Sequence, residues 1–435
     1  MKSSAAALGI VLMVCASAAP LTQSVTLVSQ QAGLDPDAEI RLIVARPEIR
    51  RALAIVRELE AGSEQELIEL TEIPAPPFEE AARAARYVEL LGGAGLDDVA
   101  VDEVGNVIAR RPGTGDGETV AFVAHLDTVF PSGTDVTVRR DGDRLYAPGI
   151  GDNTRGLVLL LNVARALARA DVRTVADILF VGSVGEEGLG DLRGVRYLLR
   201  AGGPRIDRFI AIDGEGDNRV VNQALGSRRY RITLTGPGGH SWGDFGLVNP
   251  AHALGRVVFY FDEAAAEVVN AGPPTSYNVG RIGGGTSVNA VPHESWAEVD
   301  LRSVDSEQLK RVDDVLRRAV DRAVDEQNRR RDRGEPLQAE IEPIGDRPSG
   351  TVDPDTPLVR RALAVTRFLG LSPRLDAAST DANVPIADGI PAVTIGRGGV
   401  GGGAHSLGEW WTAKDAHVGT ERALLLLVAS AGLAD

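Results

Sequence analysis

Residues 120–129 read VAFVAHLDTV, an apolar run that ends in a histidine and an aspartate. A short apolar run without polar alternation is typical of a strand that is buried on both faces of a parallel sheet. His125 and Asp127 then lie at the carboxyl edge of the sheet, where α/β proteins bind ligands. Because side chains two residues apart share a face, Asp127 is predicted to reach the ring nitrogen of His125 that points away from a metal. A chance pair at a strand end is the alternative.

Helical and strand patterns alternate around this stretch. We expect helices at 37–70, with a second helix opened by a Ser63–Glu66 capping box, and at 81–91, 156–170, 358–368 and before Ala431. We expect strands at 104–109, 120–124, 176–184, 209–212 and 392–395. The alternation predicts an α/β fold with a mainly parallel sheet flanked by helices.

The pattern changes in the middle of the chain. The expected order is strand, helix, strand, strand, helix, strand, at 229–235, 251–267, 275–282, 295–302, 306–331 and 339–344. This order predicts a small ferredoxin-like α+β domain, a lid or dimerisation domain, inserted at 224–348. The catalytic domain would then comprise residues 19–223 and 349–435. The arginine-rich stretch 329–333 is predicted to be a solvated helix end.

The first 18 residues have the pattern of a secretory signal peptide: Lys2, an apolar run at 5–14, and small residues at 16–18. We therefore expect a secreted or periplasmic protein. Cleavage of this signal peptide would remove Cys15, the single cysteine, so the mature chain would have no disulfide or thiolate chemistry. No later run is apolar enough to cross a membrane. The net charge of −15 over 435 residues argues against nucleic acid or an anionic membrane as a partner.

Acidic residues and histidines recur where the predicted strands end. They are Asp152 in GIGDN (149–153), Glu186 and Glu187 in GEEG (185–188), Asp213 after its strand, and His405 in GGGAHS (401–406). Taken singly, Asp152 could cap a helix and the glutamates could form an exposed turn. Together with His125, the set provides two histidines and three carboxylates, which suit a pair of zinc ions. Glu186 is left over, placed to take a proton from metal-activated water.

The same motifs resemble the M20 family of dinuclear zinc peptidases and amidohydrolases, which includes tripeptidase T and glutamate carboxypeptidase. The matching stretches are 125–129, 151–153, 185–187, Asp213, 238–241 and 404–406. The resemblance implies that His125 binds one zinc, His405 binds the other and Asp152 bridges them, while Glu187 and Asp213 complete the set. It implies that Asp127 orients His125 and that Glu186 is the general base and acid. It also implies a cis peptide bond after Asp152.

The resemblance extends to residues of the inserted domain. His240 would steady the oxyanion, often from a partner subunit, and Asn289 would bind substrate. Arg302 would hold a substrate carboxylate or simply pair with a neighbour on the sheet. His252, His293 and His417 are interpreted as structural or surface residues, and the glycine-rich run 396–403 as a mobile wall beside the substrate.

These observations lead to an expected function. We expect a secreted dizinc metallopeptidase that hydrolyses amide bonds of short peptides. The alternatives are an N-acyl-amino-acid amidohydrolase of the same family, and a metal- or peptide-binding protein without turnover. A homodimer could form through the outer strand of the inserted domain.

Overall fold

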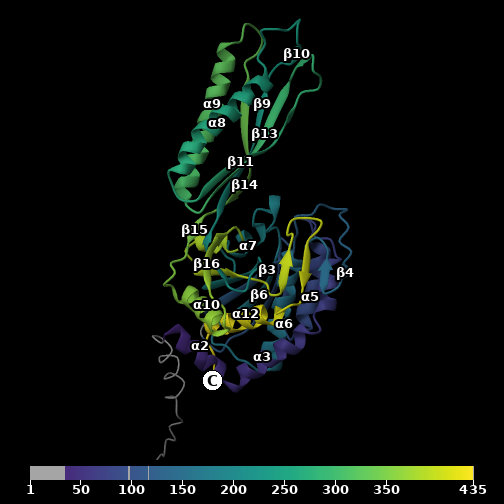
Figure 1. The fold of residues 1–435 in the computed structure, drawn as a ribbon, viewed down its shortest axis with the longest axis vertical. Coiled ribbons are helices and arrows are strands. Elements are labelled where there is room, and N and C mark those ends of the chain that lie inside the picture. The colour runs from purple at the N-terminus through teal and green to yellow at the C-terminus, as the bar shows by residue number, and fades with distance from the viewer. Residues whose placement is uncertain (1–34, 97, 116, 435) are drawn as a thin grey trace, which may run out of the picture.

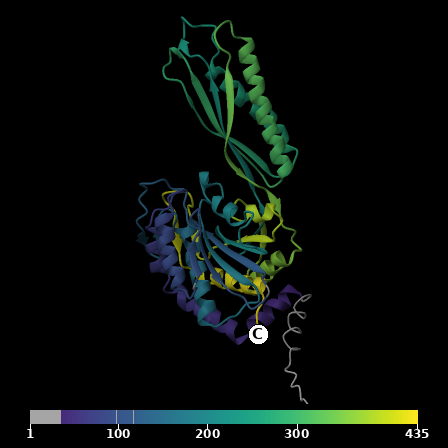
Figure 2. The ribbon, with the colours of Figure 1, turned by 180° about the vertical axis from the view of Figure 1, so that it is seen from behind.

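The structure, a computed structural model, describes residues 35–96, 98–115 and 117–434, and consists of two lobes (Figure 1). The predicted signal peptide lies outside the described residues. Within them, no helix combines the length and the apolar character needed to span a membrane. The larger lobe contains both ends of the described chain, and the smaller lobe contains its middle (Figures 1 and 2).

A nine-stranded sheet forms the centre of the larger lobe. Its order is β1-β2-β6-β3-β7-β17-β8-β15, and β16 pairs with β8. The middle strands β6, β3, β7 and β17 are parallel. β2 and β8 pair antiparallel with the outer members of this group, β1 and β15 pair antiparallel with β2 and β8, and β16 is parallel to β8. The predicted mainly parallel sheet is therefore confirmed. The bounds are β1 Asp98–Val101, β2 Val107–Arg111, β3 Thr119–His125, β6 Asp177–Ser183, β7 Arg208–Ile212, β8 Arg219–Ala224, β15 Gly350–Thr351, β16 Arg374–Ala378 and β17 Ala392–Ile395.

Two apolar helices, α6 and α12, pack against the middle of this sheet. Both are buried almost along their whole length, because they carry apolar residues on nearly every side. Together with β3, β6 and β7 they form the main hydrophobic core. The helices of this lobe are α2 Pro36–Ala45, α3 Pro47–Glu60, α4 Glu64–Thr71, α5 Ala81–Gly92, η1 Ile150–Arg155, α6 Gly156–Arg169, η2 Gly188–Gly190, α7 Arg193–Leu198, α10 Pro357–Phe368, α11 Asn383–Ala387 and α12 Ala416–Ala431.

The predicted helical segment 37–70 differs from the structure in two respects. It is broken at Arg46, which is extended because the residue before a proline disfavours the helical conformation. The predicted capping box is also wrong. The Ser63 hydroxyl donates to the carbonyl of Glu60, and Glu66 pairs with Arg165 of α6. Glu66 therefore forms an ion pair with a neighbouring helix instead of capping its own helix.

The smaller lobe has the predicted element order. Four antiparallel strands in the order β11-β13-β9-β14 are joined by two long helices, α8 and α9, which pack together and against the sheet. This lobe has a hydrophobic core of its own. The predicted solvated helix end is confirmed, since residues 329–333 are exposed. The bounds are β9 Gly226–Thr235, β10 Gly239–His240, α8 Pro250–Asn270, β11 Thr275–Gly284, β12 Ala290–Val291, β13 Glu294–Ser303, α9 Ser306–Arg329 and β14 Gln338–Arg347.

The chain passes between the lobes at two nearby points. It leaves the central sheet at Ala224, where β8 ends, and enters the second sheet at Gly226. It returns between Arg347, the last residue of β14, and Gly350, the first of β15. A small sheet in the order β18-β19-β5-β4 completes the larger lobe. Its strands are β4 Arg139–Asp141, β5 Arg144–Tyr146, β18 Val400–Gly402 and β19 Trp410–Thr412.

Candidate metal centre

The parallel strands bring the predicted metal ligands together. His125 is the last residue of β3, Glu187 follows β6, and Asp213 follows β7. Asp152 lies in η1 just before α6, and His405 lies in the turn between β18 and β19. Four of these five side chains line a single cavity of about 220 Å³. The fifth, His125, contacts Asp152, which is one of the four. Side chains up to 280 residues apart in the sequence therefore converge: three lie at the ends of parallel strands, which meet at one edge of the sheet, and Asp152 and His405 come from two neighbouring segments.

Asp152 occupies the centre of this group. Its Oδ1 lies 3.3 Å from Nε2 of His125, and its Oδ2 lies 3.2 Å from Nε2 of His405. Nε2 of His405 is also 2.9 Å from Oε1 of Glu187. Each oxygen of one carboxylate thus faces a different imidazole, which is the arrangement expected of a bridging ligand.

The donor atoms fit a cation. Potential ligand atoms of His125, Asp152 and Glu187 lie within 4.8 Å of one another. Nδ1 of His125 is 3.0 Å from the carbonyl oxygen of Asp127, which only accepts hydrogen bonds, so Nδ1 carries a proton and Nε2 is the nitrogen available to a metal. Nε2 of His125 is buried without a hydrogen-bond partner and faces the carboxylate of Asp152. A metal ion satisfies both groups at once.

The electrostatics of the cluster also favour positive charge. Burial and the nearby Asp152 raise the pKa of Asp213 to about 7. Hydrogen bonds to Asp152 and Glu187 raise the pKa of His405 to about 10. Burial alone would lower the pKa of His125, but Asp152 and Asp213 hold it well above its usual value. The carboxylates thus attract protons or cations into this cavity.

The role predicted for Asp127 needs correction. The main-chain carbonyl of Asp127, not its carboxylate, is at hydrogen-bonding distance from His125; the closer carboxylate oxygen is 3.7 Å from Nδ1. The carboxylate instead accepts the backbone N–H groups of Glu186 and Glu187, at 3.0 and 2.8 Å. Asp127 therefore positions both the His125 ring and the loop that carries the two glutamates. The peptide bond between Asp152 and Asn153 is cis, as the resemblance implied.

Glu186, the predicted general base, is buried beside this cluster and lines the same cavity. Its Oε1 lies 2.9 Å from Nη1 of Arg347, and Arg347 also donates to the main-chain carbonyl of Glu186. Burial raises the pKa of Glu186 well above its usual value, although Arg347 opposes the shift. The sequence analysis missed Arg347, since a lone arginine at the end of a strand carries no local signal.

Three further arginines, Arg219, Arg229 and Arg302, line the cavity. One role expected for Arg302, binding a substrate carboxylate, stays a prediction. The other, pairing with a neighbour on the sheet, is confirmed, because its Nε lies 2.7 Å from Asp300. Asp300 also pairs with Arg229, at 3.1 Å. One carboxylate thus holds two guanidinium groups. The terminal nitrogens of Arg302 make no hydrogen bond within the described part of the chain.

His240 and Asn289 do not line this cavity. They lie on the paired strands β10 and β12 and their adjoining turn, at the end of the smaller lobe remote from the central sheet (Figures 1 and 2). Both are exposed or nearly so. The backbone N–H groups of Trp242 and Gly243 each lie 3.2 Å from Nδ1 of His240. Nδ1 therefore accepts, and a neutral ring presents its Nε2–H outward as a donor.

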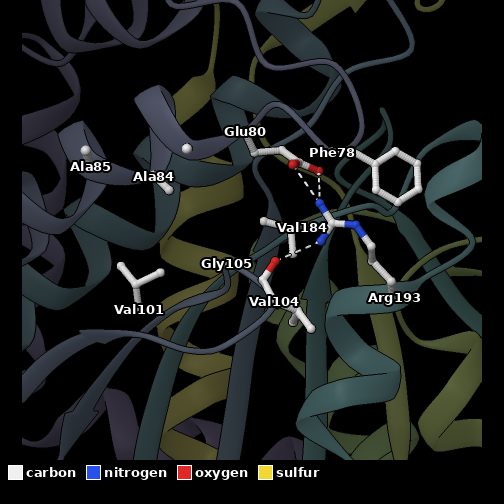
Figure 3. Close-up of a pocket in the computed structure, with 10 residues that line it drawn as sticks. Phe78, Glu80, Ala84, Ala85, Val101, Val104, Gly105, Val184 and Arg193 are labelled. Atoms are coloured by element: carbon white, nitrogen blue, oxygen red, sulfur yellow. Dashed lines mark hydrogen bonds and ion pairs between the residues drawn. The ribbon is translucent and has the colours of Figure 1, made fainter.

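The other sites singled out in the sequence have no part in the cavity. His252 and His293 are exposed and His417 is half-buried. The run 396–403 contributes β18, which pairs with β19; its role as a mobile wall beside the substrate stays a prediction. The residues that line a separate pocket include Phe78, Val101 and Val184 (Figure 3). Its two charged residues, Glu80 and Arg193, pair with each other at 2.6 Å, so it offers no free charge for catalysis.

The comparisons with known proteins agree with this geometry. The sequence profile of the family described as Peptidase family M20/M25/M40 matches residues 121–429. The protein named "Uncharacterized protein YqjE" of Bacillus subtilis (strain 168) is 24% identical over 357 residues, which cover 77% of this chain and 89% of that protein. Acetylornithine deacetylase of Myxococcus xanthus is 29% identical over 340 residues, 74% of this chain and 82% of that protein.

A solved structure shows the same fold. The crystal structure of aminopeptidase PepT from Bacillus cereus ATCC 10987 superposes with a TM-score of 0.68 at 21% sequence identity, and covers 86% of this chain and 99% of that one. The family profile spans most of the chain, and His125, Asp152 and Glu187 form a metal-binding group within it. This chain therefore belongs to peptidase family M20/M25/M40 and is a metal-binding hydrolase.

Proposed function

We propose that the protein is a dizinc peptidase that hydrolyses the amide bond of short peptides with a free carboxylate. The observation that carries the proposal is the placement of Asp152 between the Nε2 atoms of His125 and His405. His125, Asp152 and Asp213 would hold one ion, and His405, Asp152 and Glu187 the other. Two zinc ions bound there would activate a water molecule and polarise the scissile carbonyl.

Glu186 is the group that moves the proton. Its carboxylate lies in the same cavity as the ligands without being needed as one, and burial favours its protonated form. It takes a proton from the attacking water and delivers it to the leaving nitrogen. Replacing Glu186 by glutamine keeps the side-chain volume and removes the base. Turnover should fall by about 10²–10⁴-fold while the metal content stays unchanged. Full activity of this variant would contradict the assignment.

The arginines favour a substrate with a carboxylate. Asp300 neutralises only one of Arg229 and Arg302, and the terminal nitrogens of Arg302 are left to form a two-pronged pair with a carboxylate. Arg302→Ala should raise KM for peptides with a free carboxyl terminus and leave KM unchanged for the matching C-terminal amides. An equal effect on both substrates would place the carboxylate elsewhere.

His240 would act from a second copy of the chain, because it lies outside the cavity of its own chain. His240→Ala and Glu186→Gln homodimers should each be nearly inactive. Mixed after subunit exchange, they should regain activity, since a heterodimer contains one site with both residues intact. No recovery, or a fully active monomer, would contradict action in trans.

Secretion is part of the proposal and rests on residues 1–18. Export suits an enzyme that degrades short peptides outside the cytoplasm. N-terminal sequencing of protein from the periplasmic fraction should begin near residue 19. Full-length protein confined to the cytoplasm would contradict this part alone.

A deacylase is the second candidate, because acetylornithine deacetylase is among the relatives of this chain. Matched pairs such as glycyl-leucine and N-acetyl-leucine share the leaving amino acid and separate the two activities. We expect hydrolysis of the dipeptide, loss of activity with a chelator, and recovery with zinc. Hydrolysis of the acyl compounds alone would favour the deacylase, and no hydrolysis of either class would contradict the proposed function.

A further inference from the structure

A buried carboxylate, that of Glu409, holds the segment that carries Asp152. Its Oε1 accepts the backbone N–H groups of Gly151 and Asp152, at 2.9 and 2.8 Å, and its Oε2 accepts that of Gly149, at 2.7 Å. The side chain is only 1% exposed. Successive backbone N–H groups that converge on one point form a binding site for an anion, and here the chain itself supplies the anion.

Glu409 also belongs to the segment that carries His405. Residues 403–409 form a compact turn in which the backbone N–H groups of Ser406 and Glu409 donate to the carbonyls of Gly403 and Ser406. Only three residues therefore lie between His405 and Glu409, whose carboxylate binds the Asp152 segment. Glu409 therefore links the segment of His405 to the segment of Asp152, and the side chains of these two residues lie 3.2 Å apart.

Arg397 also contacts the segment that carries Asp152. It is buried, and its Nη1 lies 4.0 Å from Oδ1 of Asp152, while its Nη2 pairs with Glu215 at 3.3 Å. A Cβ at Gly151 would lie 2.8 Å from Nη2 of Arg397 and 2.9 Å from Oε1 of Glu409. The absence of a side chain at residue 151 is thus what lets both groups approach the backbone of this segment.

We infer that Glu409 is a positioning residue that sets the separation of Asp152 and His405, and thereby the affinity of the site for the cation on the His405 side. The inference rests on the proposed two-cation function. Asp152 is shared by both cations, but the other ligands proposed for the second cation, His125 and Asp213, lie at the ends of β3 and β7, whereas His405 lies in the same turn as Glu409. Loss of the Glu409 contacts should therefore weaken one cation and spare the other.

The test is a zinc titration of metal-stripped protein against a chromophoric chelator. Wild type should bind two zinc ions. Glu409→Gln places an amide N–H against a backbone N–H and should weaken one ion by about 10–100-fold, as is usual when a group that orients ligands is lost. The matched control is Glu39→Gln, which removes an equally buried carboxylate paired with Arg361, away from the metal ligands. The control should bind both ions as wild type does.

Two further variants identify the ion that is affected. His405→Ala should lose the same ion, and adding Glu409→Gln to it should not weaken the remaining one. Gly151→Ala disturbs the contacts of Glu409 and Arg397 with the Asp152 segment without removing a charge. It should therefore also weaken the ion on the His405 side, which keeps the test decisive if Glu409→Gln does not fold. Two wild-type affinities in Glu409→Gln, or weakening of both ions, would overturn the inference. Absence of zinc binding by wild type would instead overturn the proposed function.

Discussion

The pair formed by Glu186 and Arg347 allows a quantitative prediction about stability. Both side chains are at most 5% exposed, and Arg347 also donates to the Ser379 hydroxyl at 3.0 Å. Arg347→Met keeps most of the apolar stem but leaves the Glu186 carboxylate buried without its partner. Removing one member of a buried ion pair costs about 3–5 kcal/mol. The folded-to-unfolded ratio should therefore fall by a factor of at least about 100, since about 1.4 kcal/mol corresponds to a factor of ten.

A double-mutant cycle isolates the part due to the charge pair. Glu186→Gln alone leaves the buried guanidinium without its carboxylate, whereas the double variant leaves neither charge. The double variant should be more stable than the sum of the single effects predicts, by about 1–3 kcal/mol. Urea unfolding of chelator-treated protein measures these free energies, because bound cations would also interact with Glu186. Additivity within about 0.5 kcal/mol would refute the reasoning.

The pH dependence of Arg347→Met has a definite sign. Burial already raises the pKa of Glu186 in the folded protein, and loss of Arg347 raises it further. A carboxyl whose pKa is higher in the folded than in the unfolded state destabilises the fold as pH rises above the unfolded value. The destabilisation of Arg347→Met should therefore be largest at alkaline pH and shrink on acidification. A penalty that grows toward low pH would contradict this assignment.

Two further predictions concern stability away from the cavity. Burial would raise the pKa of Glu60, but Arg155 and the hydrogen bonds from Thr420 and Asn162 lower it overall, so this group stabilises the fold above its unfolded pKa and loses that effect as pH falls. Glu60→Gln should be destabilised at pH 7 and approach wild type near pH 3 in urea unfolding; a constant gap would contradict this. Phe180→Ala removes a fully buried ring packed edge-on to Phe122 at 5.8 Å and should cost about 3–5 kcal/mol by the same assay. A loss under 1 kcal/mol would show that the core refills the space.

The sequence predicted the convergence of these side chains for a physical reason. Buried parallel strands are recognisable as apolar runs, and their carboxyl ends meet at one edge of the sheet. His125, Glu187 and Asp213 could therefore be placed together without any knowledge of the strand order. The element order of the smaller lobe was predictable for a similar reason, since its amphipathic helices and alternating strands are long.

The groups that support these ligands could not be predicted in the same way. Glu409 acts through backbone N–H groups some 260 residues earlier in the sequence, and Arg347 reaches Glu186 across 161 positions. Such contacts leave no spacing pattern, because any buried carboxylate or guanidinium could make them. Asp127 illustrates the limit: the residue was predicted correctly as a partner of His125, but its carbonyl makes the contact.

The smaller lobe would influence the cavity in two separate ways. His240 lies at its remote end and would reach a site only in a second copy of the chain. Arg347 lies where β14 returns to the central sheet, and its guanidinium contacts the proposed base of its own chain directly. The same guanidinium also donates to the Ser379 hydroxyl of the larger lobe. The state of the proposed base would therefore depend on the lobe of its own chain, while stabilisation of the oxyanion would depend on the lobe of its partner.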